Sequence, residues 1–208
     1  MMLFYIRGSL EALLDGIVTE PEKIDDYYLQ MLNEAKFLQR LVNDLLDLSK
    51  LQSLDFVIDK TEISLCDVIE DSIKSASHLG EKEKVKIEFT KKVENCSLLG
   101  DYGRIRQMIM IILNNAIKFS PENETVDIIL EDQKLLIKDK GIGISAKDLP
   151  YIFDRFYKAR SEQNKTGTGL GLPIAKKIAD RHHIQLIAES TKGEGTTFIF
   201  IFGKKNLS

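Results

Sequence analysis

The sequence lacks a long apolar run, an excess of one charge and any cluster of cysteines. Its longest apolar run, Met108–Leu113, is far too short to span a bilayer, and no basic flank with a signal-type apolar stretch opens the chain. The 29 Lys and Arg residues nearly balance the 32 Asp and Glu residues, so a net charge of -3 gives no overall attraction to nucleic acid or anionic membrane. These absences predict a soluble protein without a nucleic-acid partner.

Only two cysteines are present, Cys66 and Cys96, and they show neither a CxxC spacing nor a nearby histidine cluster. This pattern favours two reduced, semi-buried thiols in a cytoplasmic protein, with a disulfide as the less favoured alternative. The chain also lacks internal repeats and low-complexity tracts. Its 208 residues, 43% of them hydrophobic and 29% charged, are ordinary for a folded chain of one or two domains.

Two amphipathic helices are predicted at the start of the chain. The first covers Tyr5–Val18, and Pro21 suits the first turn of the second. The second helix has a broad apolar stripe, which is too wide for one partner helix, so two hairpins forming a four-helix dimer are expected. Packing of the hairpin against its own globular domain is the alternative. The stripe consists of Ile24, Tyr28, Met31, Ala35, Leu38, Leu41, Val42, Leu45, Leu48 and Leu51.

After residue 54 the pattern changes to mixed helices and strands, which predicts a hairpin domain at 1–54 and a second domain at 55–208. The second domain is expected to be an α+β sandwich, with one mixed sheet and helices on one face. The predicted strands are Phe56–Ile63, Val85–Phe89, Val126–Leu130, Leu135–Lys138, Ile184–Glu189 and Thr196–Phe202. The predicted helices are Leu65–Ser77, Arg104–Lys118 and Leu172–Arg181, with a short one near Ile152.

A glycine-containing loop, Asp139-Lys140-Gly141-Ile142-Gly143-Ile144, directly follows a predicted strand. With Ala146 it fits the dinucleotide fingerprint Gly-x-Gly-x-x-Ala. That interpretation fails because a dinucleotide site needs a βαβ unit whose second strand ends in an acidic residue about twenty positions on. The corresponding stretch, 157–162, has no strand character.

A second glycine-rich block, Gly167-Thr168-Gly169-Leu170-Gly171-Leu172, opens a predicted helix. Glycines allow close approach of backbone N–H groups to an anion, and the start of a helix adds a favourable dipole. The block therefore predicts a phosphate-binding loop. It is not a P-loop, because the chain has no Gly-x-x-x-x-Gly-Lys-Ser/Thr motif.

The apolar helix Arg104–Lys118 carries polar residues near its end. Asn115 and Lys118 lie one turn apart, so the amide and the ammonium share a face. An amide oxygen together with phosphate oxygens and waters is a suitable shell for Mg²⁺.

These three blocks resemble the N box (106–121), the G1 box (139–144) and the G2 box (167–172) of sensor histidine kinases of bacterial two-component systems. Phe153-Asp154-Arg155-Phe156-Tyr157 resembles their F box, and all four stand in the family's order and spacing. Residues 5–8 and 41–49 are similar to the family's dimerisation helices. The resemblance implies the two-layer ATP-binding sandwich shared with gyrase and chaperone-type ATPases.

The resemblance also implies roles for individual residues. Asp139 would accept the adenine amino group, and Asn115 would bind Mg²⁺. Lys118 and Arg155 would contribute to catalysis by binding phosphate and adding positive charge. The remaining nucleotide-binding residues would be Gly141 and Gly143 beside the adenine, and Gly167, Thr168, Gly169, Leu170 and Gly171 beside the phosphates.

The activity implied is transfer of the γ-phosphoryl group of Mg-ATP to a histidine, followed by relay to an aspartate of a response regulator. The chain is expected to form a homodimer and to belong to a membrane-anchored parent protein.

Two positions depart from the family. No histidine precedes His78, so the phosphate-accepting histidine would lie upstream of Met1, and Ile111 replaces a second asparagine. These departures favour the alternative, a non-catalytic, nucleotide-gated dimerisation module.

Overall fold

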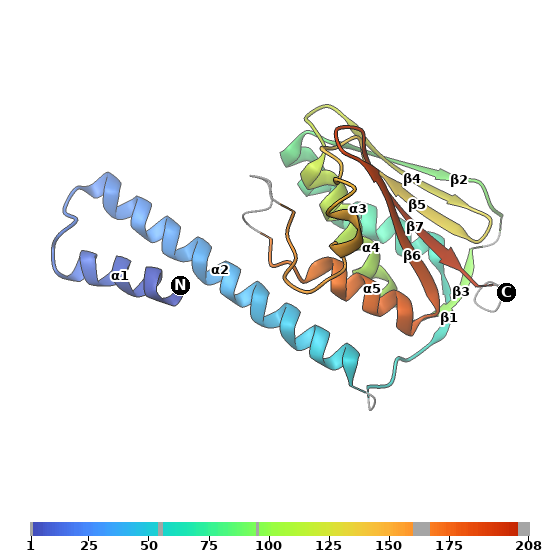
Figure 1. Ribbon diagram of the computed structural model, residues 1–208, viewed down its shortest axis with the longest axis horizontal. Helices are drawn as coiled ribbons and strands as arrows, with labels where there is room; N and C mark the ends of the chain where they lie inside the picture. The colour runs from blue at the N-terminus through green and yellow to red at the C-terminus, as the bar shows by residue number, and fades with distance from the viewer. Residues whose placement is uncertain (1, 54–55, 95, 160–166, 204–208) are drawn as a thin grey trace. The chain divides into compact units, whose positions relative to one another are not determined.

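The computed structural model describes residues 2–53, 56–94, 96–159 and 167–203 (Figure 1). The chain divides into two compact units, Met1–Leu46 and Asp47–Ser208. Within the described ranges, no helix has an apolar stretch long enough to cross a membrane.

The first unit consists of α1 (Met2–Leu14) and most of α2 (Pro21–Gln52), the two arms of a hairpin in Figure 1. The predicted end of the first helix at Val18 is wrong. Gly16 adopts a left-handed φ of 66°, and its N–H donates to the carbonyl of Leu13 at 3.3 Å. A left-handed glycine ends a helix because it turns the chain away from the helical path.

The second unit contains a five-stranded mixed sheet in the order β2-β4-β5-β7-β6, as the sequence predicts a mixed sheet. The β2–β4 pair is parallel and the other three pairs are antiparallel. The connection from β2 to β4 passes through α4, which allows parallel pairing. The strands are β2 (Lys86–Lys91), β4 (Thr125–Glu131), β5 (Lys134–Lys138), β6 (Ile184–Thr191) and β7 (Gly195–Phe202).

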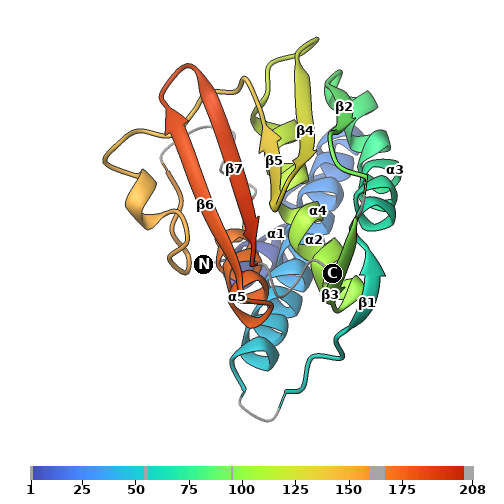
Figure 2. The same cartoon turned by 90° about the vertical axis from the view of Figure 1, so that its right-hand side faces the viewer.

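Three helices cover one face of this sheet: α3 (Leu65–Glu83), α4 (Tyr102–Phe119) and α5 (Gly171–Arg181) (Figures 1 and 2). Inward-facing residues alternate along the strands, and in β7 they include the buried Phe198, Phe200 and Phe202. The expected α+β sandwich is confirmed. The short helix expected near Ile152 is the 3-10 turn η1 (Leu149–Tyr151).

A small second sheet pairs β1 (Thr61–Ser64) with β3 (Ser97–Gly100) in antiparallel register. The sequence does not predict β3, and the predicted strand Phe56–Ile63 is wrong over 56–60, which have no regular structure. Tertiary contacts hold this segment instead. The guanidinium of Arg104 lies 5.3 Å from the centre of the Phe56 ring, and Arg181 donates to the Phe56 carbonyl.

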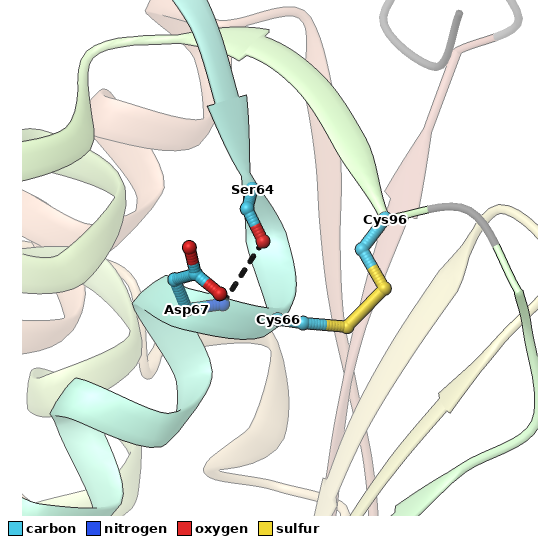
Figure 3. Close-up of a disulfide and its surroundings, with 4 residues drawn as sticks. All are labelled: Ser64, Cys66, Asp67 and Cys96. Atoms are coloured by element: carbon cyan, nitrogen blue, oxygen red, sulfur yellow. Dashed lines mark hydrogen bonds between the residues drawn. A yellow bond between two sulfur atoms is a disulfide. The ribbon is translucent and has the colours of Figure 1, made fainter.

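Cys66 and Cys96 form a disulfide, with Cα atoms 5.7 Å apart (Figure 3). This finding corrects the expectation of two reduced thiols. The β1–β3 pairing brings the start of α3 beside the residue that precedes β3, and the Leu65 N–H donates to the Cys96 carbonyl at 2.7 Å. Because this contact depends on the unpredicted β3, the cysteine spacing alone could not indicate it.

Candidate functional site

Asp139 directly follows β5 and is only 4% exposed. Its Oδ1 accepts hydrogen bonds from the backbone N–H groups of Gly141 at 2.8 Å and Thr196 at 3.2 Å. Among the residues that the structure describes, no hydrogen bond ends on Oδ2, which leaves this oxygen for a donor on a ligand. Burial raises the pKa of the carboxyl above its ordinary value, while the two N–H groups lower it by a smaller amount.

The two glycines after Asp139 lie against backbone. A Cβ added to Gly141 would overlap the Phe119 carbonyl at the end of α4, and one added to Gly143 would overlap the Thr191 carbonyl. Gly143 also has a left-handed φ of 61°. The family resemblance assigns these glycines the role of leaving room for the adenine ring. The structure gives a second reason, which is that only glycine lets this loop pack between α4 and the β6–β7 turn.

The β6–β7 hairpin holds the loop through residues that sequence reasoning missed. Ser190 Oγ accepts from the Ile144 N–H at 2.8 Å and donates to the Gly195 carbonyl at 2.7 Å. Gly193 N–H donates to the Ile142 carbonyl at 2.8 Å. Thr196, the second residue of β7, is only 7% exposed and lies on the same buried face of the strand as the three phenylalanines. A polar residue at such a position signals a hydrogen-bonding role.

Helix α4 places Asn115 and Lys118 on one half-buried side, away from the seven fully buried residues of its core face. The N-cap Asp101 begins the helix, since its Oδ1 accepts from the Arg104 N–H at 3.0 Å. Lys118 Nζ lies 5.3 Å from the centre of the Phe119 ring. The amide of Asn115 and the ammonium of Lys118 therefore lie near the end of α4, where the Asp139 loop contacts the helix.

Ile111 lies one turn before Asn115 and packs against the start of α5. A Cβ added to Gly171 would come within 3.3 Å of Ile111 Cγ2. A side chain at 171 would therefore be in tight contact with Ile111, so glycine suits the close approach of the two helices. The α4–α5 contact thus brings the predicted phosphate loop to the face that carries Asn115.

The start of α5 has the features of an anion site. Leu170 occupies the N-cap position and makes no side-chain capping bond, although its own N–H donates to Thr168 Oγ1 at 3.3 Å. Uncapped N–H groups and the helix dipole favour an anion there. The φ of Gly169 is 74°, and a Cβ on Gly169 would press on the Phe156 backbone. Gly167 is half-buried at the beginning of the described part of this loop.

The F-box residues anchor the loop but do not all reach the site. The Phe156 N–H donates to the Gly169 carbonyl at 2.9 Å. Arg155 is exposed, and within the described residues it makes no hydrogen bond or ion pair to Asn115, Lys118 or Asp139. Asp148 accepts from Ser145 Oγ at 2.7 Å and from the Tyr157 hydroxyl. These two donors, Ser145 first, lower the pKa of Asp148.

The site is therefore built from four segments. The Asp139 loop and the start of α5 both contact α4, whose end is the third segment, and the β6–β7 turn contacts the Asp139 loop. In the described part of the chain, no group of three or more His, Cys, Asp or Glu side chains could hold a metal ion. A divalent cation here would share Asn115 with oxygens of a bound ligand.

Residues 100–206 match the family model described as histidine kinase-, DNA gyrase B-, and HSP90-like ATPase. Sensor protein SrrB of Staphylococcus aureus (strain MRSA252) is 30% identical over 212 residues, which cover 93% of this chain and 34% of the relative. Sensor histidine kinase WalK of Bacillus subtilis (strain 168) is 34% identical over 205 residues, which cover 94% and 33%. The chain thus spans about a third of the length of these curated relatives.

Solved structures show the same architecture. The histidine kinase AdeS of Acinetobacter baumannii superposes with a TM-score of 0.76 at 22% identity, covering 98% of this chain and 96% of that one. Histidine kinase ThkA, in complex with response regulator protein TrrA, gives a TM-score of 0.73 at 23% identity and coverages of 98% and 59%. These structures support the fold, and the family match together with the relatives SrrB and WalK shows that the chain belongs to the histidine kinase-, DNA gyrase B-, and HSP90-like ATPase family, on its sensor histidine kinase branch.

Proposed function

We propose that this chain is the catalytic core of a sensor histidine kinase, which binds Mg-ATP and transfers the γ-phosphoryl group to a histidine. The observation that carries this proposal is the buried carboxylate of Asp139, whose Oδ1 accepts two backbone N–H groups while Oδ2 is left for a ligand. An adenine amino group is a suitable donor for Oδ2, and a bond to an ionised acceptor contributes about 1.5–3 kcal/mol.

The other residues bind the rest of the nucleotide in this proposal. The uncapped start of α5 receives phosphate oxygens, with Gly167, Thr168 and Gly169 beside them. Lys118 neutralises phosphate charge. Asn115 holds Mg²⁺ together with the phosphates, and the ion would supply charge neutralisation during transfer. Arg155, which is exposed in this structure, adds positive charge near the phosphates in this proposal.

The acceptor is a histidine of a dimerisation helix, outside the residues of this chain. His182 is unsuited to the role because it is buried and bonds to two backbone groups. The imidazole would be the nucleophile, and the protein would mainly hold it in line with the γ-phosphate. Relay to an aspartate of a response regulator is proposed by analogy with ThkA, whose structure contains such a partner.

The hairpin is proposed to form the dimer, as a domain covering 1–54 that precedes the ATP-binding domain at 55–208. Several large apolar side chains of α1 and α2 are exposed in the single chain, and a second copy of the hairpin would bury them. They include Leu10, Leu14, Tyr28, Leu29, Leu32, Val42 and Leu45. A membrane-anchored parent chain is part of the same proposal.

The test is transfer of label from γ-labelled ATP, with Mg²⁺, to the protein extended upstream of Met1 through the acceptor segment. Asp139→Asn serves as the control. Acid-labile labelling that is reduced in the control at subsaturating ATP supports the kinase. Absence of label with intact ATP binding contradicts it.

A second candidate is a nucleotide-gated dimerisation module without phosphoryl transfer. It is favoured by Ile111, an apolar side chain that packs on Gly171 and cannot coordinate an ion. Ile111→Asn in the extended protein separates the two functions. A kinase limited by this position would gain labelling at unchanged ATP affinity, whereas a module would gain none, and Ile111→Leu is the matched apolar control.

A further inference from the structure

The disulfide between Cys66 and Cys96 joins two segments of the chain that backbone hydrogen bonds already hold together. Four residue pairs join β1 to β3, ending at Ser64 and Ser97, the neighbours of this link. Beyond them the Leu65 N–H donates to the Cys96 carbonyl at 2.7 Å, and Ser97 Oγ donates to Glu62 Oε1 at 2.6 Å. None of these bonds requires the sulfur–sulfur bond, so the two thiols stay adjacent when the link is open.

The position of Cys66 at the start of a helix favours the reactive thiolate form of its side chain. Cys66 is the second residue of the 19-residue helix α3, shortly after the N-cap Ser64, whose Oγ accepts from the Asp67 N–H at 3.2 Å (Figure 3). The positive end of a helix dipole stabilises a thiolate, which is the attacking form of cysteine. Cys66 and Cys96 are nearly buried, with 8% and 9% of their surface exposed.

We propose that Cys66 and Cys96 form a reversible redox site that exchanges with low-molecular-weight disulfides of the glutathione type. The Cys66 thiolate attacks one sulfur of the small disulfide and expels the other as a thiolate. The Cys96 thiolate then attacks the Cys66 sulfur of the mixed disulfide and expels the second small thiolate. The protein loses two electrons and two protons, and the small disulfide is reduced to two thiols.

The disulfide constrains the part of the second unit that leads into α4. It joins residues 30 positions apart and so encloses α3 and β2. On the other side, β3 leads directly into Asp101, the N-cap of α4. Closing a loop of this length restricts the unfolded chain. We therefore expect the oxidised protein to unfold about 5–10 °C higher than the reduced protein.

The experiment equilibrates the full chain, without nucleotide, in buffers of varied ratio of reduced to oxidised glutathione. Alkylation and mass measurement count free thiols, and thermal unfolding is recorded on the same samples. We expect two free thiols and a low midpoint in reducing buffer, both reverting when the ratio is reversed. In Cys66→Ala/Cys96→Ala the midpoint should be independent of the ratio.

The variant Cys96→Ser tests the order of attack, because it should accumulate one glutathione on Cys66. Three results would overturn the proposal: thiols that stay free at every ratio, a link that no ratio opens, or equal midpoints for the two forms. The proposal goes beyond nucleotide binding, and since no nucleotide is present, its failure would leave the kinase proposal untouched.

Discussion

The backbone of Thr196 binds Asp139 through both its N–H and its carbonyl. The Thr196 N–H donates to Asp139 Oδ1 at 3.2 Å, and the Asp139 N–H donates to the Thr196 carbonyl at 2.9 Å. These residues are 57 positions apart, yet together with Gly141 they fix which oxygen of the carboxylate is occupied and which is left over. The orientation of the proposed adenine acceptor is therefore set by the sheet and does not depend on the ligand.

Replacement Asp139→Asn tests this division between the two oxygens. An amide keeps an oxygen for the N–H groups of Gly141 and Thr196, but its nitrogen cannot accept a hydrogen bond from adenine. We expect ATP affinity to fall at least about tenfold in calorimetry, the equivalent of about 1.4 kcal/mol or more.

The stability of the same variant provides the control. Because burial raises the pKa of Asp139, ionisation of this carboxyl disfavours folding. The contribution of Asp139 to the free energy of unfolding therefore falls as the pH rises from 3.8 through the raised pKa of the folded state. The amide of Asp139→Asn carries no charge, so at neutral pH the variant should be at least as stable as the parent in urea unfolding. A destabilised variant would show that the lost affinity reflects damage to the fold.

Ser190 is predicted to position the Asp139 loop from outside it. Ser190→Ala removes the acceptor for the Ile144 N–H and the donor to the Gly195 carbonyl. Loss of such bonds costs about 1–2 kcal/mol, so we expect ATP to bind roughly 5–30-fold more weakly. Thr191→Ala, an exposed side chain in the same hairpin, is the matched control and should leave affinity unchanged. Equal affinities of Ser190→Ala and the parent would exclude this role.

Helices with strong periodicity were predictable from sequence, and so were the blocks that carry the candidate site. The α4 helix was found because its apolar residues recur along one face and polar residues end it. By contrast, β3 is only four residues long, and its partner β1 lies more than thirty positions earlier. No local pattern reveals such a pairing, and the disulfide that depends on it was missed for the same reason.

The residues that hold the Asp139 loop in place could not be predicted from the sequence either. The blocks containing Asp139 and Gly171 carry their own glycine pattern, whereas Ser190 and Thr196 acquire their roles only through the order β5-β7-β6. Long-range pairing decides that order. The segment 56–60 shows the converse, since its strand-like composition is overridden by contacts with Arg104 and Arg181.

The variants Gly143→Ala and Gly193→Ala separate close packing from backbone conformation. Both glycines have left-handed φ values, 61° and 88°, so either alanine incurs a conformational cost of about 1–2 kcal/mol. Only at 143 would the new Cβ overlap backbone, that of Thr191, whereas at 193 no atom lies within 4 Å. We expect Gly143→Ala to lose ATP binding and Gly193→Ala to keep it, as measured by calorimetry. Comparable affinities would contradict the packing argument.

His182 should make the stability of the second unit depend on pH. Its Nδ1 bonds the Ile178 carbonyl at 2.8 Å and its Nε2 accepts from the Asp101 N–H at 3.1 Å, so the neutral ring joins α5 to the N-cap of α4. Burial is the main cause that lowers the pKa of His182 below 6.5.

A depressed histidine pKa means that the unfolded chain takes up the proton first. The stabilisation is therefore complete above pH 6.5 and is lost as pH falls from 6.5 through the folded value, by about 1.4 kcal/mol for each unit between them. Urea unfolding from pH 7.5 to 5 should show this loss in the parent and in His183→Asn, whose exposed neighbouring ring provides the control. In His182→Gln the slope should decrease, because an amide in place of the ring does not titrate. An unchanged slope in His182→Gln would assign the acid sensitivity to other groups.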